Sequence, residues 1–344
     1  MTLSLRTLCA QALLTTSLLS VAGAAFAQSG DEAATEDVAT TEESAPVIDP
    51  GPAITPYAGP AIGSAPSVGP STATNSSNSF HADMDLKFRV QPLGLVLSTR
   101  LYNEHEYMKN NIGLLFSHVF FRAGAAVNIS PAYAEVGPEI EFQPIRIFSV
   151  RAAYLGAYNF GTFKYMLSYD NPDPITRDDE LKEIADQAES GFSQRVEVQP
   201  TFQVALGRIA VRNTFTFQRM WYSDNEFDGP YLRESSYDRM ISTNGDTVLA
   251  NLLVAMYQVA DPDGPRGDGT AYAGVFHEWA RGVSTQDNRH RIGLMGLYVP
   301  KHNWGKFYRP RLILQAGYNL VDRENGRDGR FFVQGQLGFT LHGR

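Results

Sequence analysis

The chain has 344 residues, with 29 Lys and Arg against 37 Asp and Glu, and a formal net charge of −8. Seven of the acidic residues lie between Gln28 and Phe80, a stretch without Lys or Arg, so the rest of the chain is near neutral and nothing in it indicates a nucleic-acid partner. The single cysteine, Cys9, lies in the first apolar run, which excludes metal–thiolate sites and thiol catalysis from all that follows.

Residues 1–27 have the pattern of a secretory signal peptide. Arg6 supplies a basic start, a largely apolar run extends from Leu8 to Ala25, and Ala25-Phe26-Ala27 provides a small-residue cleavage site. Polar residues at positions 15–17 interrupt the run, whereas a membrane span needs roughly 20 predominantly apolar residues. We therefore expect a cleaved export signal rather than a membrane anchor.

Residues 28–81 form an acidic stretch followed by a segment rich in Pro, Gly, Ala and Ser. Few large apolar side chains are available here to offset the entropy that ordering would cost. We expect a disordered periplasmic tail. The functional alternative is a plug or an arm that binds a partner.

From residue 82 onward the pattern changes to strict alternation. In the first run Met84, Leu86 and Phe88 alternate with Asp85 and Lys87, as in a strand with one apolar and one polar face. Turn residues separate further runs of this kind. The sequence predicts twelve strands, at residues 82–91, 94–103, 112–128, 132–142, 146–160, 190–206, 208–222, 247–260, 270–281, 289–300, 309–320 and 330–341.

These strands favour an all-β fold, a closed antiparallel transmembrane β-barrel of about 12 strands spanning residues 82–344. Most run ten residues or more, whereas strands of soluble proteins have a mode of ~5–6 residues. Aromatic residues gather near the strand ends, as the two membrane interfaces select. Tyr231–Ile241 could hide another strand, so the range is 10–14. An even number places both termini on the periplasmic side.

The signal peptide, the strand pattern and the terminal strand Phe331–Leu341 resemble the broad superfamily of bacterial outer-membrane β-barrels. The resemblance covers roughly residues 82–344 and indicates no subfamily. It implies a porin-like protein in the outer membrane of a Gram-negative bacterium, surrounded by outer-membrane lipid and lipopolysaccharide. The sequence predicts no cofactor and does not fix an oligomeric state.

Charged side chains on the polar face are the candidate functional residues, because that face would line the barrel lumen. A salt-bridged, filled interior is one interpretation. The other is a narrow channel for small polar solutes, in which an acidic strand opposes a basic wall. Barrels of ~8 strands are filled by side chains and porins of 16–18 strands are open, so a barrel of twelve strands fits either interpretation. The candidates are Asp85, Lys87, Arg89, Arg100, Glu135, Glu139, Glu141, Arg151, Arg195, Glu197, Arg212, Arg291 and Arg311.

Twelve strands is also the size of outer-membrane phospholipase A, so a lipid-modifying enzyme is the third hypothesis. Ser117 and His118 are adjacent in an expected strand, where their side chains would point to opposite faces and could not share a proton. His277 and His290 have no serine at a fixed spacing. We therefore favour a channel, with a non-conducting structural or adhesive barrel as the alternative, and predict no catalytic residues.

Two loops carry further patterns. Asp224, Glu226 and Asp228 followed by Gly229 resemble the first half of a calcium loop, but Ser235 stands where a bidentate glutamate belongs. A solvated acidic loop is the alternative, and no other metal site is expected. Within residues 161–190, Thr176 and an apolar stripe predict a short capped helix that could fold over the barrel mouth or into it.

Overall fold

A computed structural model describes residues 78–90, 94–108, 119–162, 166–171, 188–223, 227, 229–234, 239–260, 269–305, 307–322 and 329–342. The signal peptide, nearly all of the 28–81 segment, Ser117-His118, the helix expected after Thr176 and the calcium candidates Asp224, Glu226 and Asp228 lie outside the described residues. None of the described segments contains a helix of the length and apolar character needed to span a membrane.

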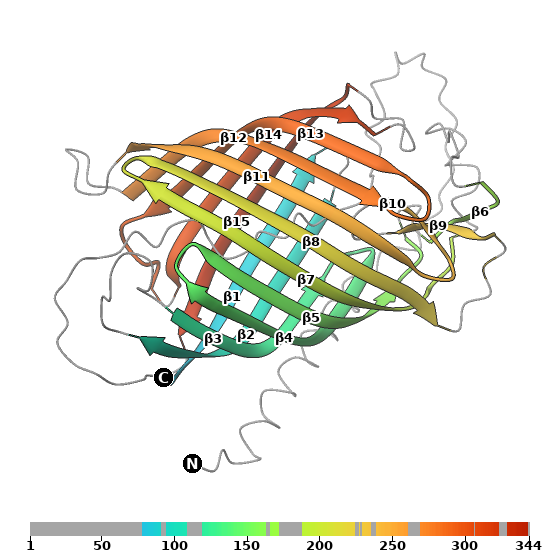
Figure 1. Cartoon of the computed structure of the whole chain (residues 1–344), viewed down its shortest axis with the longest axis horizontal. Coiled ribbons are helices and arrows are strands. Elements are labelled where there is room, and N and C mark those ends of the chain that lie inside the picture. The colour runs from blue at the N-terminus through green and yellow to red at the C-terminus, as the bar shows by residue number, and fades with distance from the viewer. Residues whose placement is uncertain are drawn as a thin grey trace, which may run out of the picture. The chain divides into compact units, whose positions relative to one another are not determined.

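The wall is a closed barrel of twelve antiparallel strands, in the order β1-β15-β14-β13-β12-β11-β8-β7-β5-β4-β3-β2 (Figure 1). The strands are β1 (Asn78–Val90), β2 (Gly94–Met108), β3 (Val119–Ile129), β4 (Tyr133–Ile145), β5 (Phe148–Asn159), β7 (Gly191–Leu206), β8 (Ile209–Ser223), β11 (Asp246–Ala260), β12 (Gly269–Gly282), β13 (Asn288–Pro300), β14 (Tyr308–Val321) and β15 (Phe331–His342). The predicted fold class is confirmed, and each expected strand overlaps one strand of the wall.

First and last strands close the barrel by pairing antiparallel, with His81 opposite His342 and Val90 opposite Val333. Asn78 and His342 therefore lie at one end, which we call the termini end. The opposite end, the loop end, holds the connections β1–β2, β3–β4, β5–β7, β8–β11, β12–β13 and β14–β15. In single-chain bacterial barrels the termini end is periplasmic and the loop end is external.

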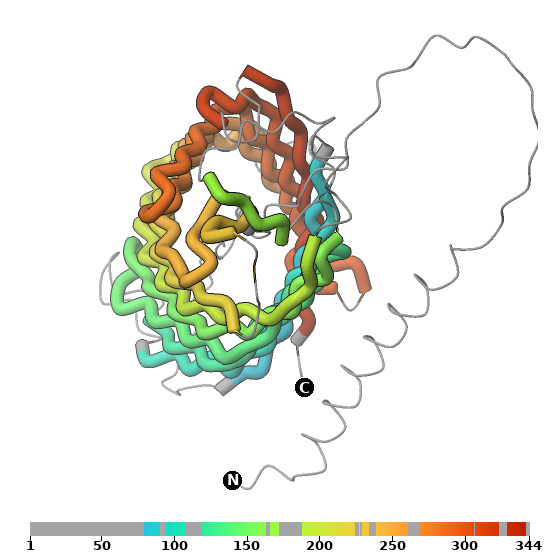
Figure 2. The backbone as a smooth tube through the Cα atoms, turned by 90° about the vertical axis from the view of Figure 1, so that its right-hand side faces the viewer, coloured from blue at the N-terminus to red at the C-terminus, as the bar shows by residue number. Residues whose placement is uncertain are grey.

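Three further strands form a separate small sheet at the loop end, in the order β10-β9-β6: β6 (Ser168–Tyr169), β9 (Tyr231–Glu234) and β10 (Arg239–Ser242). They come from the β5–β7 and β8–β11 connections. Seen from the loop end, these segments lie inside the ring of wall strands (Figure 2). The region Tyr231–Ile241 thus contains strands, as its pattern allowed, but they pack at the loop end and add nothing to the wall (Figure 1).

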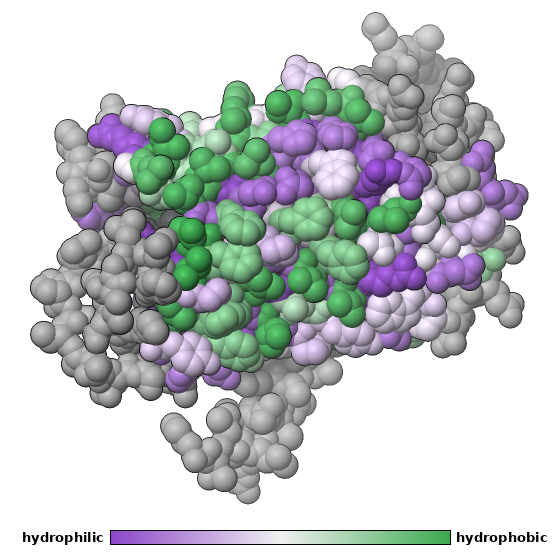
Figure 3. Space-filling model, in the orientation of Figure 1, coloured by the Kyte–Doolittle hydropathy of each residue, from purple (hydrophilic) through white to green (hydrophobic). Residues whose placement is uncertain are grey.

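Alternation along the wall is inside-out relative to a soluble protein. On β4, Glu139 and Glu141 point inward and are 4% and 1% exposed, whereas Ile140 and Phe142 point outward and are 51% and 46% exposed. Apolar side chains cover much of the visible outer wall (Figure 3). Closure pairs the edge strands β1 and β15 with each other, so that the wall can meet hydrocarbon.

The inner face has two different halves. From β2 to β7 it is charged, whereas on the other side of the ring it carries a buried apolar cluster of Val254, Met256, Phe276, Met295, Leu297 and Phe332. The near-continuous apolar run 248–256 of β11 supplies Val254 and Met256, because alternate residues of the run point inward, and β12, β13 and β15 supply the other four.

Candidate functional site: the lumen and its closed end

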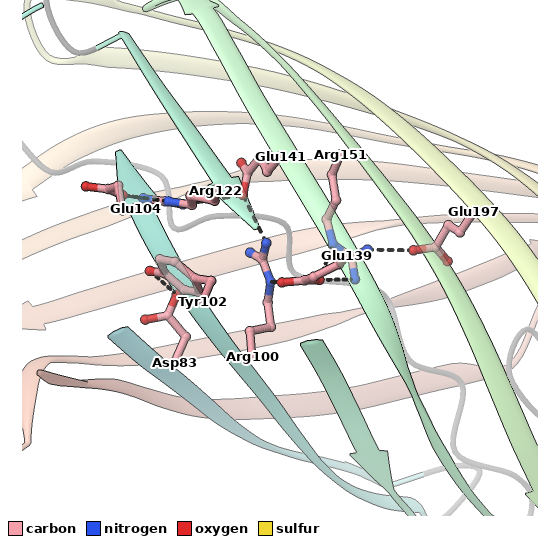
Figure 4. A network of polar contacts seen from close by, with 9 residues as sticks. All are labelled: Asp83, Arg100, Tyr102, Glu104, Arg122, Glu139, Glu141, Arg151 and Glu197. Carbon is pink, nitrogen blue, oxygen red and sulfur yellow. Dashed lines mark hydrogen bonds and ion pairs between the residues drawn. The ribbon is translucent and has the colours of Figure 1, made fainter. Parts of the chain in front are cut away.

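Arginines and glutamates of the charged half form a connected network of ion pairs (Figure 4). Glu139 on β4 is the bridge: its Oε1 accepts from Nε of Arg100 at 2.6 Å, and its Oε2 lies 2.7 Å from Nη2 of Arg151. Nη1 of Arg151 continues the chain to Oε1 of Glu197 at 2.7 Å. Burial of an ionised group is costly unless several partners satisfy it, and the shared contacts of Glu139 meet that need.

The same network extends toward β3. Oε2 of Glu141 lies 3.0 Å from Nη2 of Arg100 and 3.3 Å from Nη1 of Arg122, and Nη2 of Arg122 lies 2.6 Å from Oε2 of Glu104. The guanidinium of Arg122 also stacks over the ring of Tyr102, 4.8 Å from its centroid. Separately, Oε1 of Glu135 accepts from Nη2 of Arg195 at 2.5 Å.

All of these pairs join wall strands that are adjacent or separated by one strand. Arg100 on β2 reaches β4, and Arg195 on β7 also reaches β4, with one strand between in each case. The carboxylates of β4 therefore do not face a separate basic wall across the lumen; arginines from both sides interleave with them. Such lateral pairs hold the charged side chains along the wall.

The first strand of the wall, β1, is joined to the last two, β14 and β15, by side-chain contacts as well as by the backbone pairing of β1 with β15. Oδ1 of Asp85 on β1 accepts from Nη2 of Arg311 on β14 at 2.7 Å and from Nε2 of Gln336 on β15 at 2.9 Å. Gly338 lies opposite Asp85 on β15. A Cβ at this glycine would overlap the carboxylate and come 2.6 Å from Nε of Arg311, so the ion pair occupies the space that a side chain would need.

A third ionic group lies on β12 and β13. Glu278 forms an ion pair with Arg289, and Arg291, 0% exposed, donates from Nε to Oδ1 of Asn319 at 2.8 Å. The Arg291 guanidinium also lies 4.9 Å from the ring centroid of Phe332, where this ionic group meets the apolar half. A buried guanidinium over an aromatic face gains electrostatic stabilisation without a further carboxylate.

The small sheet is held in the loop end by apolar packing and by one arginine. Met166, Leu232 and Ile241 pack with inward-facing residues of the wall, in one buried cluster that also contains Tyr133, Met220, Val248, Ala250 and Ala280. Arg239 on β10 is 0% exposed. Its Nη1 lies 2.6 Å from Oδ1 of Asp287 in the β12–β13 connection, and its Nη2 lies 2.7 Å from Oδ1 of Asp322 after β14. We call this three-residue group the Arg239 clasp.

All thirteen charged residues singled out from the sequence lie on the inward side of their strands, by the alternation of exposed and buried positions. Four more members of the ionic groups were missed: Glu104, Arg122, Glu278 and Arg289. Glu104 and Arg289 each stand an even number of residues from a recognised inward charge on the same strand, so extending the alternation would have found them. Arg122 and Glu278 stand on β3 and β12, where no inward charge had been recognised. The Arg239 clasp has no such signal, because its residues lie in three different connections or their edges.

The histidines considered for lipid chemistry are on the outer wall. Nδ1 of His290 lies 3.4 Å from Nε2 of His277, and the ring of Trp279 lies beside His290. Within the described residues neither ring is hydrogen-bonded to a serine hydroxyl, so no nucleophile–base pair is formed there. The described segments also contain no group of three or more side chains suited to hold a metal ion.

No protein-family model matches the chain, and no curated protein is similar to it. Among solved structures, the NanC porin is 12% identical, covering 76% of this chain and 100% of that chain with a TM-score of 0.36. The β domain of the Bordetella autotransporter BrkA is 8% identical, covering 77% and 98% with a TM-score of 0.42. The anion-selective porin from Comamonas acidovorans is 7% identical, covering 78% and 99% with a TM-score of 0.30.

At these identities and TM-scores the similarities say nothing of what the protein does, and the barrel fold is described from the structure itself. The closed wall, its apolar outer face and its ion-paired inner face are what a bilayer requires of a spanning sheet. The described residues thus form a closed antiparallel β-barrel of the membrane-spanning kind.

Proposed function

We propose that the protein is a narrow outer-membrane channel for small polar solutes that the small sheet holds shut. The observation that carries the proposal is the seating of β6, β9 and β10 inside the loop end, fixed by the Arg239 clasp. A barrel of ~8 strands is filled by its own side chains, whereas wider barrels enclose cavities, channels or plugs. A twelve-stranded wall therefore leaves room for a separate obstruction.

The lateral ion pairs support the same proposal. They neutralise the inner charges in place, with Arg100, Arg122, Arg151 and Arg195 against Glu104, Glu135, Glu139, Glu141 and Glu197. A lining of this kind is polar and nearly balanced, which suits small polar solutes without strong selection by charge. The apolar cluster around Phe276 faces it from the other half of the ring and narrows the path.

A non-conducting structural or adhesive barrel is the second candidate. The observation that favours it is the low solvent exposure of several inner charges: Glu141 is 1% exposed and Arg291 is 0% exposed. A lumen whose side chains are packed this closely would not conduct ions as long as that packing is kept. The two candidates differ in whether removing the small sheet opens a path.

Conductance in planar bilayers tests the proposal. We expect the wild-type protein to be closed most of the time and a variant with residues 229–242 replaced by a short Gly/Ser linker to give small, steady conductance steps. Removal of residues 172–187 from the neighbouring connection is the matched control and should leave the channel closed. A shift in gel mobility on heating would show that the linker variant folds. If the folded linker variant does not conduct, the hypothesis of a non-conducting structural barrel is correct. Equal conductance of wild type and linker variant would show that the small sheet closes nothing.

A further inference from the structure

Two arginines near the loop end point away from the lumen, toward the surroundings of the barrel. Arg219 on β8 lies two residues from the outward-facing Phe217, which is 41% exposed, and Arg281 on β12 lies on the same face as Val275. The inward-facing neighbours Gln218 and Ala280 are both fully buried. Both guanidinium groups are thus carried on the side of the wall that faces the bilayer.

Neither outward arginine has a carboxylate partner within the described residues, unlike the ion-paired arginines inside. The contact of Arg219 is neutral: its Nη1 donates to Oγ1 of Thr247 at 3.3 Å. Nε of Arg281 is shielded from solvent and has no hydrogen-bond acceptor in the same described part of the chain. Uncompensated positive charge next to a membrane favours an anionic ligand from outside the protein.

Tryptophans flank both arginines and place them at the level of lipid headgroups. Trp221 lies two residues from Arg219 on the same face of β8, and Trp279 lies two residues from Arg281 on β12. The Trp221 ring is 6.4 Å from the ring of Tyr154, and the Trp279 ring is 6.4 Å from that of His290. Rings of this kind gather where the hydrocarbon ends and the headgroups begin. Hydrophilic side chains also break the apolar cover toward this end in Figure 3.

The separation of the two arginines follows from the strand register. Thr247 on β11 is opposite Arg219 on one side, and Leu249 on β11 is opposite Arg281 on the other. The arginines are therefore two strands apart and offset by two residues, which places their Cα atoms about 12 Å apart. Two flexible side chains at this spacing suit a headgroup with two separate phosphates better than one with a single phosphate.

We propose that the outward face of β8, β11 and β12 at the loop end binds lipopolysaccharide through its two lipid A phosphates. Arg219 and Arg281 each bind one phosphate, in the forked geometry that a guanidinium offers to phosphate oxygens. Thr247 lies between them and turns its hydroxyl outward. The proposal rests on the expected outer-membrane location, in which the loop end faces the external leaflet that contains lipopolysaccharide.

Native mass spectrometry of the detergent-solubilised full chain, titrated with diphosphoryl lipid A, tests the proposal. Each arginine near a charged lipid surface is worth about a fivefold change in affinity, so the double variant R219Q/R281Q should bind roughly 25-fold more weakly than wild type. The matched control R146Q/R208Q removes two positive charges from turns at the termini end and should bind like wild type. Binding by wild type should also weaken as salt is raised.

Two further lipids separate the possible sources of phosphate. Dephosphorylated lipid A should bind weakly to wild type and variant alike, and phosphatidylglycerol, with a single phosphate, should show little dependence on Arg219 and Arg281. Equal binding of lipid A to wild type and to R219Q/R281Q would overturn the proposal, as would an equal loss in the R146Q/R208Q control. So would a phosphatidylglycerol affinity as high as that of lipid A. The single variants R219Q and R281Q provide the same comparison if the double variant does not fold.

Discussion

Replacing Arg239 by methionine is the sharpest test of how the small sheet is held. Methionine keeps much of the side-chain volume but removes the charge. The carboxylates of Asp287 and Asp322, 1% and 0% exposed, would then face each other without the cation that lies 2.6 and 2.7 Å from them in the structure. Asp287 would keep one contact, since its Oδ2 accepts from the backbone N–H of Met240 at 2.8 Å.

The size of the effect follows from the burial of the clasp. Removing one partner of a buried ion pair costs about 3–5 kcal/mol, because the remaining charge stays desolvated and loses its cation. Since about 1.4 kcal/mol is a factor of ten in an equilibrium, the ratio of seated to released sheet should fall by roughly 10² to 10³. The wall itself loses none of its backbone hydrogen bonds, so the barrel should remain folded.

Single-channel recording measures the change as open probability. We expect R239M to be open far more often than wild type, and R239K to lie between them, because a lysine can hold one carboxylate but lacks the planar fork that holds both. The triple variant R239M/D287N/D322N is the matched control: it removes the stranded charges and should return toward the closed state. A folded R239M protein with wild-type open probability would refute the reasoning. So would a triple variant as open as R239M.

Further predictions concern the wall, the lining and the tail. The purified protein should migrate differently on a denaturing gel before and after boiling, since its closed wall resists detergent; partition with soluble periplasmic protein would contradict this. G338A should lower the stability to urea by about 1–3 kcal/mol, because the new methyl group meets the Asp85–Arg311 pair, whereas G296A, with open space at its Cβ, should not. Deleting residues 30–77 should leave folding and insertion unchanged, because that segment has few side chains to bury; loss of the folded barrel would show that it packs inside. In the R239M background, the combined substitutions E135Q, E139Q and E141Q should shift the reversal potential toward anion preference, because they remove three carboxylates from the lining. An unchanged reversal potential would mean that solutes do not pass along β4.

The wall could be predicted from the sequence because its physical rule is local. A strand that faces lipid on one side and a polar lumen on the other must alternate, and runs such as Met84–Val90 and Val136–Phe142 follow that rule residue by residue. The predicted ends of the strands were less accurate than their positions along the chain. β1 begins at Asn78, four residues before the expected start, and pairs there with β2.

The closed end could not be predicted, for an equally physical reason. β6, β9 and β10 have only two to four residues each, too few for a period to be recognised. Arg239 meets partners that are 48 and 83 residues away along the chain. The apolar half of the lumen had a signal in the near-continuous apolar run of β11, but such a run does not say whether its second face meets lipid or the lumen.

The ties of Asp85 have a consequence for biogenesis. This carboxylate belongs to the first strand of the wall, and its partners, Arg311 and Gln336, belong to the last two strands. Until the two edges of the wall have met, Asp85 lacks both of these partners. A chain truncated before β14 would therefore carry Asp85 without these partners at the edge where the barrel must close, and we expect such a chain not to form a stable barrel.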